Sequence, residues 1–319
     1  MRRWPEFGHN ARRRLPPFRS RNTMRRTQPA IDRVWTVLDV IDWGKEYFAR
    51  KDVDSPRLTI ELMICHVLGI GRIKLYTDHE RPLSPAELAQ LRAMIERRVR
   101  QEPLQYILGE APFYGCMLEV TADVLIPRPE TELLVERIVR HGKGRNGLRC
   151  LDIGTGSGCI AIASAVHLPQ STWLALDVSQ AAAELARRNA ERSGVADRVN
   201  VVVMDILREL PSEKFDVLAM NPPYIPSADV PELEPVVRDY EPHIALTDDS
   251  DGLTFYRRLA SVAPDIMAES GVMFWEIGFG QKESIIDIVM ANRLAVEIVD
   301  DLSGIPRLAI VGNSGVTMS

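Results

Sequence analysis

The segment LDIGTGSG, residues 151–158, contains the residues best suited to contact a cofactor. Its apolar residues predict a buried strand, and its three glycines predict a tight turn into a helix, where the backbone can come close to a ligand. The third glycine comes one residue too early for the dinucleotide pattern GxGxxG, because Cys159 occupies that place. The spacing favours S-adenosylmethionine over a nicotinamide cofactor. The expected contacts are Gly154, Thr155, Gly156, Ser157 and Gly158.

Two aspartates follow the next two predicted strands. Asp177 comes 23 residues after Gly154, where its carboxylate could accept hydrogen bonds from both hydroxyls of a ribose. Asp205 follows the apolar run VVVM and could lie near the adenine. Each aspartate alone could be a cap or turn residue, because aspartates after strands commonly are. Strand, glycine turn and acid together favour cofactor binding.

The segment MNPPYI, residues 220–225, contains the residues best suited to catalysis. Asn-Pro is a common turn dipeptide, but this one ends the fourth predicted strand, beside the expected cofactor pocket. A planar amide or aromatic amine is a poor nucleophile because its nitrogen lone pair is delocalised. The side-chain carbonyl of Asn221 and the backbone carbonyl of Pro222 could hold such an NH2 group with its lone pair facing a methyl carbon.

The residues around Asn221 support this chemistry. Pro222 and Pro223 lack N–H donors and have a fixed φ, so the two acceptors are held rigidly. Tyr224 offers a flat face against which a planar amide or base can pack. No strong base is needed, because the nitrogen becomes acidic only as the methyl arrives. Most of the acceleration should come from alignment and proximity, which can supply about 7 to 11 kcal/mol. Asn221 is the expected catalytic residue, with Pro222 and Tyr224, and it would also touch the cofactor.

A sheet is needed to position these motifs. After Leu148 the chain alternates short apolar strands with amphipathic helices, a pattern typical of a doubly wound parallel sheet. Residues 126–319 therefore predict an α/β, Rossmann-like domain with seven strands. These strands are expected near residues 148–153, 172–177, 199–204, 215–220, 271–277, 294–299 and 306–311.

Residues 31–102 show apolar residues at helical spacing and predict a small helical domain for substrate recognition. Two helix starts are indicated by Ser55 with Pro56 and by Ser84 with Pro85. Each pair offers a capping hydroxyl followed by a proline at the first helical position.

Residues 103–125 predict a β-hairpin that joins the two domains, with Tyr106 to Leu108 in its first half and Met117 to Val120 in its second. A further connection, residues 222–250, contains six prolines. A long loop inside a compact domain is more often functional than idle, and this one follows a strand end where open α/β sheets bind ligands.

The composition describes an ordinary globular protein, with 45% hydrophobic and 26% charged residues in a chain of 319. No apolar run approaches the roughly 20 residues of a membrane-spanning helix, so a membrane enzyme is not expected. The four cysteines form no CxxC pair and have no histidine at ligand spacing, so they predict neither a zinc site nor a disulfide framework. They are Cys65, Cys116, Cys150 and Cys159.

Charge is unevenly distributed. Residues 1–30 hold nine arginines and one acidic residue, whereas the whole chain has a net charge of −5, so the remainder is strongly acidic. An acidic body argues against sequence-independent binding of nucleic acid. The arginine-rich extension could be a transit peptide, a disordered arm, or sequence upstream of a true start at Met24. We predict a disordered extension and a cytoplasmic monomer, or an organellar protein if the extension is a transit peptide.

Several stretches together resemble the HemK/PrmC family of release factor glutamine methyltransferases. The resemblance runs from about Val34 to Gly312, and the segment IPRPETE, residues 126–132, is its most specific part. The other stretches are QEPLQYILGE, VLIPRPETELLVE, LDIGTGSGCIAIA, NPPYIP, EPHIAL, DGLTFYRRL, FWEIG and SGIPRLAIV.

The resemblance implies a class I methyltransferase sheet, S-adenosylmethionine as cofactor and, as protein substrate, the glutamine of the GGQ tripeptide in class I peptide chain release factors. Asn221, Pro222, Pro223 and Tyr224 would seat the glutamine. Gly154 to Gly158, Asp177, Asp205 and Ile206 would hold the cofactor. The family often has an aromatic residue where this chain has Ile206, so stacking on the adenine is not implied there.

Two further residues, Arg128 and Glu130, could line the mouth of the site and bind substrate. They could equally be helix-start residues, because Pro129 would enter a helix and Glu130 would favour its positive end. Glu276, at the end of a predicted strand, is a weaker candidate.

Two other functions stay open from the sequence. DNA adenine methyltransferases share the NPPY motif, although the acidic body and the lack of a recognisable target-recognition domain count against that substrate. The chain could instead be a binding module with an inactive methyltransferase fold. The intact glycine turn, Asp177 and NPPY argue against this alternative.

Overall fold

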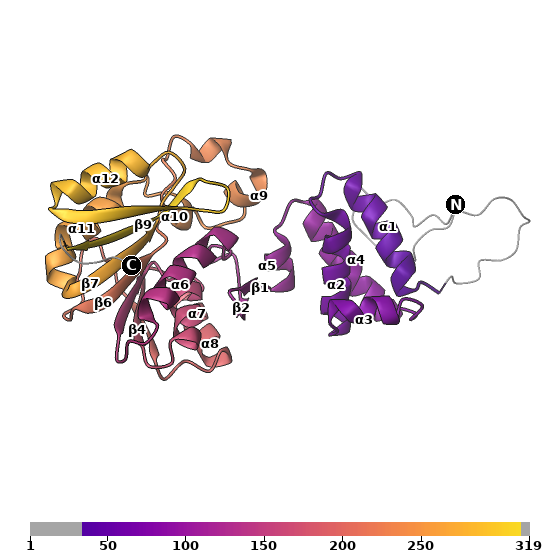
Figure 1. Ribbon diagram of the computed structural model, residues 1–319. Coiled ribbons are helices and arrows are strands. Elements are labelled where there is room, and N and C mark those ends of the chain that lie inside the picture. Colours follow the sequence, from indigo (N-terminus) through magenta and orange to yellow (C-terminus); the bar gives the residue numbers. More distant parts are fainter. Residues whose placement is uncertain (1–33, 314–319) are drawn as a thin grey trace, which may run out of the picture. The chain divides into compact units, whose positions relative to one another are not determined.

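The computed structural model describes residues 34–313, and the chain divides into two compact units, Met1–Ile107 and Leu108–Ser319 (Figure 1). The predictions for residues 1–30, including Met24 as a start, lie outside the described residues. Between residues 34 and 313, no helix is long and apolar enough to cross a membrane.

The first unit is helical, as the spacing of its apolar residues predicts. Helix α2 contacts the helices on either side of it and α4. Gly44 of α1 allows a close approach to α2, because a Cβ at this position would lie only 2.5 Å from Cγ1 of Ile60. The helices are α1 (Val37–Ala49), α2 (Pro56–Leu68), α3 (Arg72–Thr77), α4 (Pro85–Val99) and α5 (Leu104–Leu108).

The helix starts of this unit are only partly as predicted. Ser84 caps α4 in a capping box: its hydroxyl accepts from the backbone N–H of Glu87, whose carboxylate accepts from the backbone N–H of Ser84. The capping role of Ser55 is wrong, because its backbone is left-handed, with φ of 45°, and its hydroxyl makes no cap hydrogen bond. Thr36, which the sequence reading overlooked, forms a capping box at α1.

The second unit is built on a seven-stranded sheet in the order β5-β4-β3-β6-β7-β9-β8. All seven strands coincide with the predicted positions to within a few residues, which confirms the Rossmann-like α/β class. They are β3 (Arg149–Ile153), β4 (Thr172–Asp177), β5 (Val199–Val203), β6 (Phe215–Met220), β7 (Met267–Glu276), β8 (Leu294–Asp300) and β9 (Pro306–Asn313).

Helices cover both faces of this sheet (Figure 1). Along β7 the side chains alternate, so that Val272 and Phe274 pack into the core on one face and Met273 and Trp275 into the core on the other. One face carries α6 (Pro129–Gly142), α7 (Cys159–His167) and α8 (Gln180–Arg192), and the other carries α11 (Thr254–Ile266) and α12 (Lys282–Ala291).

The sheet is mixed rather than parallel throughout, because β9 runs antiparallel to both β7 and β8. Only residues 301–305 separate β8 from β9. A parallel connection needs a crossover of about a dozen or more residues, so this short link permits only an antiparallel pair.

The predicted hairpin exists, but its first half is misplaced. Residues Tyr106 to Leu108 lie in helix α5, and the strands are β1 (Glu110–Phe113) and β2 (Cys116–Glu119). Short apolar runs do not distinguish helix from strand, which explains the error. The hairpin lies within the second unit, where Asn189 of α8 accepts from the backbone N–H of Glu119 at 2.7 Å and donates to its carbonyl at 2.9 Å.

The proline-rich connection after β6 is ordered into short helical turns. It contains η1 (Val230–Glu232), α9 (Pro235–Arg238) and α10 (His243–Leu246). Its end folds back onto its beginning, because the backbone N–H of Ile225 donates to the carbonyl of Leu246 at 3.0 Å. The two ends of the connection therefore lie side by side.

Candidate active site

A cavity of about 300 Å³ lies where β3, β4 and β6 end. The strand order reverses at β3, since β4 lies on one side of it and β6 on the other. Open α/β sheets bind ligands at such a reversal, outside the carboxyl ends of the strands. The volume is at the lower end of the range of about 300 to 1,000 Å³ for small-molecule pockets.

The glycine turn forms one wall of this cavity. Gly154 and Gly156 have φ of +70° and +56°, and a Cβ at either position would meet nothing within 4 Å. The space beside their backbone is therefore open to a ligand. Gly158 has a different role: a Cβ there would lie 2.6 Å from Cδ1 of Ile162 in α7 and 3.3 Å from Cβ of Ala186 in α8, so this glycine leaves room for both side chains.

Asp152 holds the turn from beneath. Its Oδ2 accepts from the hydroxyl of Thr155 at 2.6 Å and from the backbone N–H of Ala161 at 3.2 Å. Complete burial raises the pKa of Asp152 to about 7, although the hydrogen bond from Thr155 opposes this rise. The buried carboxylate of Asp152 thus fixes the position of the glycine turn.

Asp177 lies at the end of β4 on the wall of the same cavity. Its two carboxylate oxygens accept from the backbone N–H of Gly156 at 2.8 Å and of Ser179 at 2.9 Å. Burial raises the pKa of Asp177, and these backbone hydrogen bonds lower it. The aspartate is both a turn residue and a cavity residue, so the two interpretations of its sequence position are compatible.

Asp205 and Ile206 border the cavity after β5. Asp205 Oδ1 accepts from the backbone N–H of Leu207 at 3.0 Å, which shapes the turn. Ile206 is buried, and its carbonyl accepts from Arg258 of α11 at 3.0 Å. The side chain next to Asp205 is thus aliphatic and has no aromatic ring to stack on an adenine.

Asn221, Pro222 and Pro223 also line the cavity, directly after β6. The side-chain nitrogen Nδ2 of Asn221 donates to the hydroxyl of Thr131 at 3.1 Å. Asn221 therefore borders the same cavity as the glycine turn and Asp177, as the proposed chemistry requires.

Tyr224 does not line the cavity. Its hydroxyl donates to Glu276 at 3.4 Å, and burial raises the pKa of Tyr224 well above its usual value. Its carbonyl accepts from the side chain of Gln281 at 3.0 Å, and the same Gln281 nitrogen donates to the carbonyl of Gly252 at 3.3 Å. A Cβ at Gly252 would lie 2.1 Å from the carbonyl oxygen of Tyr224, so only glycine fits there.

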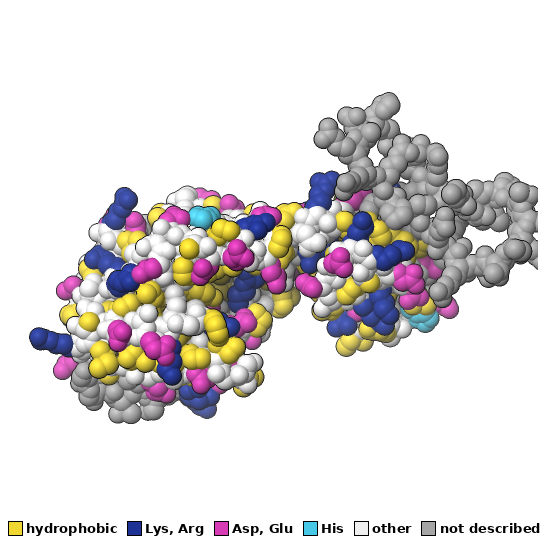
Figure 2. Space-filling model, turned by 90° about the horizontal axis from the view of Figure 1, so that it is seen from above, with side chains coloured by type: hydrophobic (Ala, Val, Ile, Leu, Met, Phe, Trp, Pro, Cys, Tyr) yellow, Lys and Arg dark blue, Asp and Glu magenta, His cyan; other side chains and the backbone are white. Residues whose placement is uncertain are grey.

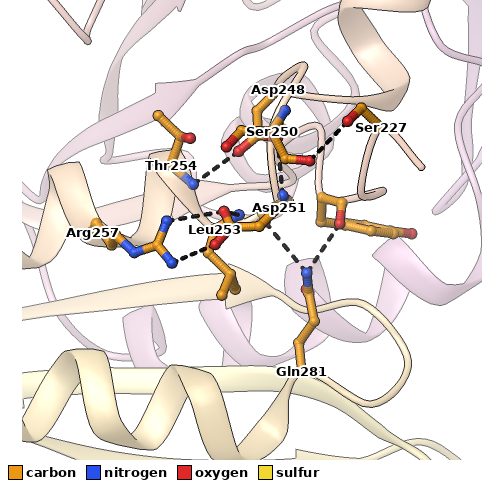
Figure 3. Close-up of polar contacts among 10 residues, drawn as sticks. Ser227, Asp248, Ser250, Asp251, Leu253, Thr254, Arg257 and Gln281 are labelled. Carbon is orange, nitrogen blue, oxygen red and sulfur yellow. Dashed lines mark hydrogen bonds and ion pairs between the residues drawn. The ribbon is translucent and has the colours of Figure 1, made fainter. Parts of the chain in front are cut away.

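The loop at residues 248–254 supports this contact (Figure 3). Asp248 accepts from the backbone N–H groups of Ser250 at 2.9 Å, of Gly252 at 2.9 Å and of Thr254 at 3.0 Å. Asp251 pairs with Arg257 of α11 on the outer side. Figure 3 shows Gln281, the residue before α12, approaching this loop, and its side chain donates to the carbonyl of Gly252.

Arg128 lies on the cavity wall and pairs with the buried Glu241 at 2.5 Å. Burial raises the pKa of Glu241, and the charge of Arg128 lowers it. Arg128 is also the residue before α6, so its place at the helix start and its place on the cavity wall are compatible, and substrate binding by Arg128 stays a prediction. Glu130 is exposed in the first turn of α6 and does not line the cavity, and neither does Glu276.

The structure brings most of the predicted residues together and adds others. On the wall are Gly154, Thr155, Gly156, Ser157, Asp177, Asp205, Ile206, Asn221, Pro222, Pro223 and Arg128, whereas Gly158 and Tyr224 are not. Thr131 and Asp248 were not expected there. Thr131 lies within the segment IPRPETE and Asp248 lies shortly after the segment EPHIAL, so both stretches could have pointed to cavity residues.

No group of three or more side chains suited to a metal ion occurs among residues 34–313, and the four cysteines there are all free thiols. On the face of the second unit that Figure 2 shows, acidic and basic side chains are interspersed and form no patch of one sign.

Two family models match the chain. Residues 39–109 match the PrmC N-terminal domain, and residues 129–232 match the methyltransferase small domain. The chain is 43% identical over 253 residues to the release factor glutamine methyltransferase of Geobacter sulfurreducens, covering 79% of this chain and 88% of that protein. It is 40% identical over 285 residues to the protein of the same name from Chlorobaculum tepidum, covering 86% and 97%.

Among solved structures, the catalytic domain of hMettl16 in complex with the MAT2A 3′UTR hairpin 6 matches with a TM-score of 0.50. It covers 75% of this chain and 87% of the other, at 15% sequence identity. This likeness concerns the fold alone.

Proposed function

Since this chain belongs to the release factor glutamine methyltransferase family, we propose that it methylates the side-chain amide nitrogen of a glutamine in class I peptide chain release factors. The acceptor is the glutamine of the GGQ motif, and the methyl donor is S-adenosylmethionine. The helical first unit recognises the protein substrate, and the second unit performs the transfer. The cytoplasmic location and the monomeric state stay predictions from the sequence.

The residues of the cavity fit this cofactor. The open space beside Gly154 and Gly156 lets an elongated ligand lie against the backbone of the turn. Each carboxylate oxygen of Asp177 already accepts one backbone N–H and has a second lone pair for a ribose hydroxyl. Ile206 offers an apolar surface for the adenine. When bound, the cofactor supplies an electrophilic methyl carbon.

The chain's own residues orient the acceptor. Asn221 Oδ1 and the carbonyl of Pro222 each accept one hydrogen from the glutamine NH2, which turns the nitrogen lone pair toward the methyl carbon. The prolines keep these acceptors from moving. Gln281 holds the carbonyl of Tyr224, so the segment is fixed at its far end too. The excess proton leaves the nitrogen only after the methyl has been transferred, so no strong base is required.

The observation that carries this proposal is the position of Asn221 on the same cavity as the glycine turn and Asp177. The cavity supports methyl transfer to an NH2 group, and membership of the family supports glutamine as the acceptor. The direct experiment incubates the purified protein with S-adenosylmethionine and a purified release factor. Mass spectrometry of the GGQ peptide is expected to show one added methyl group on the glutamine.

A second substrate, adenine in DNA, is favoured by the NPPY motif alone. The matched experiment replaces the release factor by duplex DNA and follows label from the cofactor. Label in DNA with none in the release factor would replace the proposed substrate while keeping the chemistry. An inactive binding module is distinguished by calorimetry, because such a protein would not bind S-adenosylmethionine.

A further inference from the structure

A buried chain of hydrogen bonds lies directly behind Asn221. The hydroxyl of Thr131 donates to Glu276 Oε2 at 2.6 Å and accepts from Asn221 Nδ2 at 3.1 Å. Thr131 is in the first turn of α6, Glu276 ends β7, and Asn221 follows β6. Thr131 and Glu276 are 1% and 3% exposed, so water does not compete for the bond between them, whereas the bond from Asn221 is partly buried at the cavity.

The direction in which these hydrogen bonds donate decides how the Asn221 amide is oriented, because the oxygen and nitrogen ends of an amide have nearly the same size. Packing alone therefore cannot decide whether Oδ1 or Nδ2 of Asn221 faces the cavity. The Thr131 hydroxyl has a single proton. When that proton is donated to the carboxylate of Glu276, the hydroxyl can only accept from Asn221, and it accepts from the NH2 end.

We propose that Thr131, held by Glu276, is a positioning residue that turns the Oδ1 of Asn221 toward the substrate and so makes the site select an NH2 group. This inference rests on the proposed function, because an NH2 substrate offers only donors and needs an acceptor. A reversed Asn221 amide would set one NH2 group against another, and the acceptor glutamine would lose a hydrogen bond. Neither Thr131 nor Glu276 needs to touch the substrate.

The negative charge of Glu276 keeps the hydrogen bonds running from Asn221 to Thr131 and from Thr131 to Glu276. The groups that face it are Thr131 and Glu130 from α6, Tyr224 from the segment after β6, and Arg307 from β9, while Tyr256 of α11 donates to its backbone carbonyl. Burial raises the pKa of Glu276 to about 7. Above that pH the carboxylate accepts from Thr131. Below it the protonated carboxyl can donate to Thr131. The Thr131 hydroxyl is then free to donate to Asn221 Oδ1, so both hydrogen bonds run in the opposite direction.

The test compares three variants with the wild-type protein. Thr131→Val keeps the shape and removes the hydroxyl, and we expect kcat to fall about 10- to 100-fold while the dissociation constant of S-adenosylmethionine changes less than about twofold. Thr131→Ser restores the hydroxyl and is expected to recover most of this loss. Glu276→Gln cannot ionise, so its pH profile should lack the fall in kcat below about pH 7 that we expect of the wild type.

Thr59→Val serves as the matched control. Thr59 is also buried, and its hydroxyl donates to the carbonyl of Asp54 at 3.1 Å in the first unit. The control should lose thermal stability as Thr131→Val does, with kcat unchanged. A Thr131→Val protein that is folded and turns over at the wild-type rate, with the wild-type pH profile, would overturn the inference.

A second measurement is independent of turnover. In nuclear magnetic resonance spectra, the side-chain NH2 protons of Asn221, assigned by their loss in Asn221→Ala, should show a nuclear Overhauser effect to the γ-methyl of Thr131. No such effect in the wild type at pH 8 would contradict the inference, even if the protein methylates a release factor. A wild-type protein that shows the effect but methylates no release factor would instead contradict the proposed function alone.

Discussion

The glycine turn at residues 154–157 and the segment at residues 221–223 border one cavity but are built in opposite ways. Around Gly154 and Gly156 there is open space, and the backbone itself forms the surface. Around Asn221 and Tyr224 the protein is crowded, and side chains from α6, from β7 and from Gln281, the residue before α12, fix the segment. The difference teaches that the glycine turn, the cofactor wall, provides space for a ligand. The segment around Asn221, the acceptor wall, provides the orientation of the acceptor group.

The largest expected effect follows from removing the orienting acceptor. Asn221→Ala should lower kcat by about 10² to 10³-fold, the loss measured when one preorganised group at a reacting centre is deleted. Binding of S-adenosylmethionine, measured by calorimetry, should stay within about threefold, because the glycine turn is unchanged. Near-normal turnover of this variant would remove the contrast between the two walls.

A matched pair of glycine substitutions sharpens the contrast. Gly252→Ala should cost about 2 to 3 kcal/mol of stability, because its φ is +75° and the new Cβ would overlap the carbonyl of Tyr224. Gly156→Ala should cost only about 1 to 2 kcal/mol, from its positive φ alone, yet weaken cofactor binding. Chemical denaturation measures the first quantity and calorimetry the second. Equal losses of stability would show that the two walls are equally crowded.

Asp177→Ala tests the cofactor wall by itself. Loss of charge-assisted hydrogen bonds worth about 1.5 to 3 kcal/mol should raise the dissociation constant of S-adenosylmethionine roughly 10- to 150-fold. At saturating cofactor, kcat should recover to near the wild-type value, because Asn221 is not disturbed. A kcat that stays low at saturation would assign Asp177 to the acceptor side.

The smallest expected effect concerns Gln281. Gln281→Glu keeps the size and the acceptor for the backbone N–H of Gly278, but loses the donor to the carbonyls of Tyr224 and Gly252. We expect kcat to fall about 3- to 10-fold, in line with about 0.5 to 1.5 kcal/mol for one net hydrogen bond, without a change in cofactor affinity. The control is Lys282→Ala, the neighbouring residue, which makes no described contact with Tyr224 and should behave as wild type.

The sequence predicts the strands of the sheet well because each is a short, largely apolar run, as in residues 215–220. It also places Asp177 and Asn221 on one cavity, because the carboxyl ends of neighbouring parallel strands meet at one edge. The helix starts are less reliable: Ser84 caps its helix and Ser55 does not, since the backbone angle of the residue before a helix is not visible in its type.

The partners of Asn221 could not be predicted in the same way. Thr131 lies 90 residues before it, and Glu276 lies 145 residues after Thr131, so no periodic pattern connects the three. Sequence reasoning placed Glu276 at the end of a strand but gave it no partner. Only the packing of α6 against β7 shows that its carboxylate is buried against the hydroxyl of a threonine.

The antiparallel strand β9 also affects how the chain can fold. It is inserted between β7 and β8, which are not neighbours, so β8 has no hydrogen-bonded partner in the sheet until residues 306–313 exist. During synthesis the sheet can assemble in stages from β3 to β7, whereas its last third must wait for the final strand. Nascent chains that stop before residue 306 should therefore leave an unpaired edge at β7, a site for association with other chains.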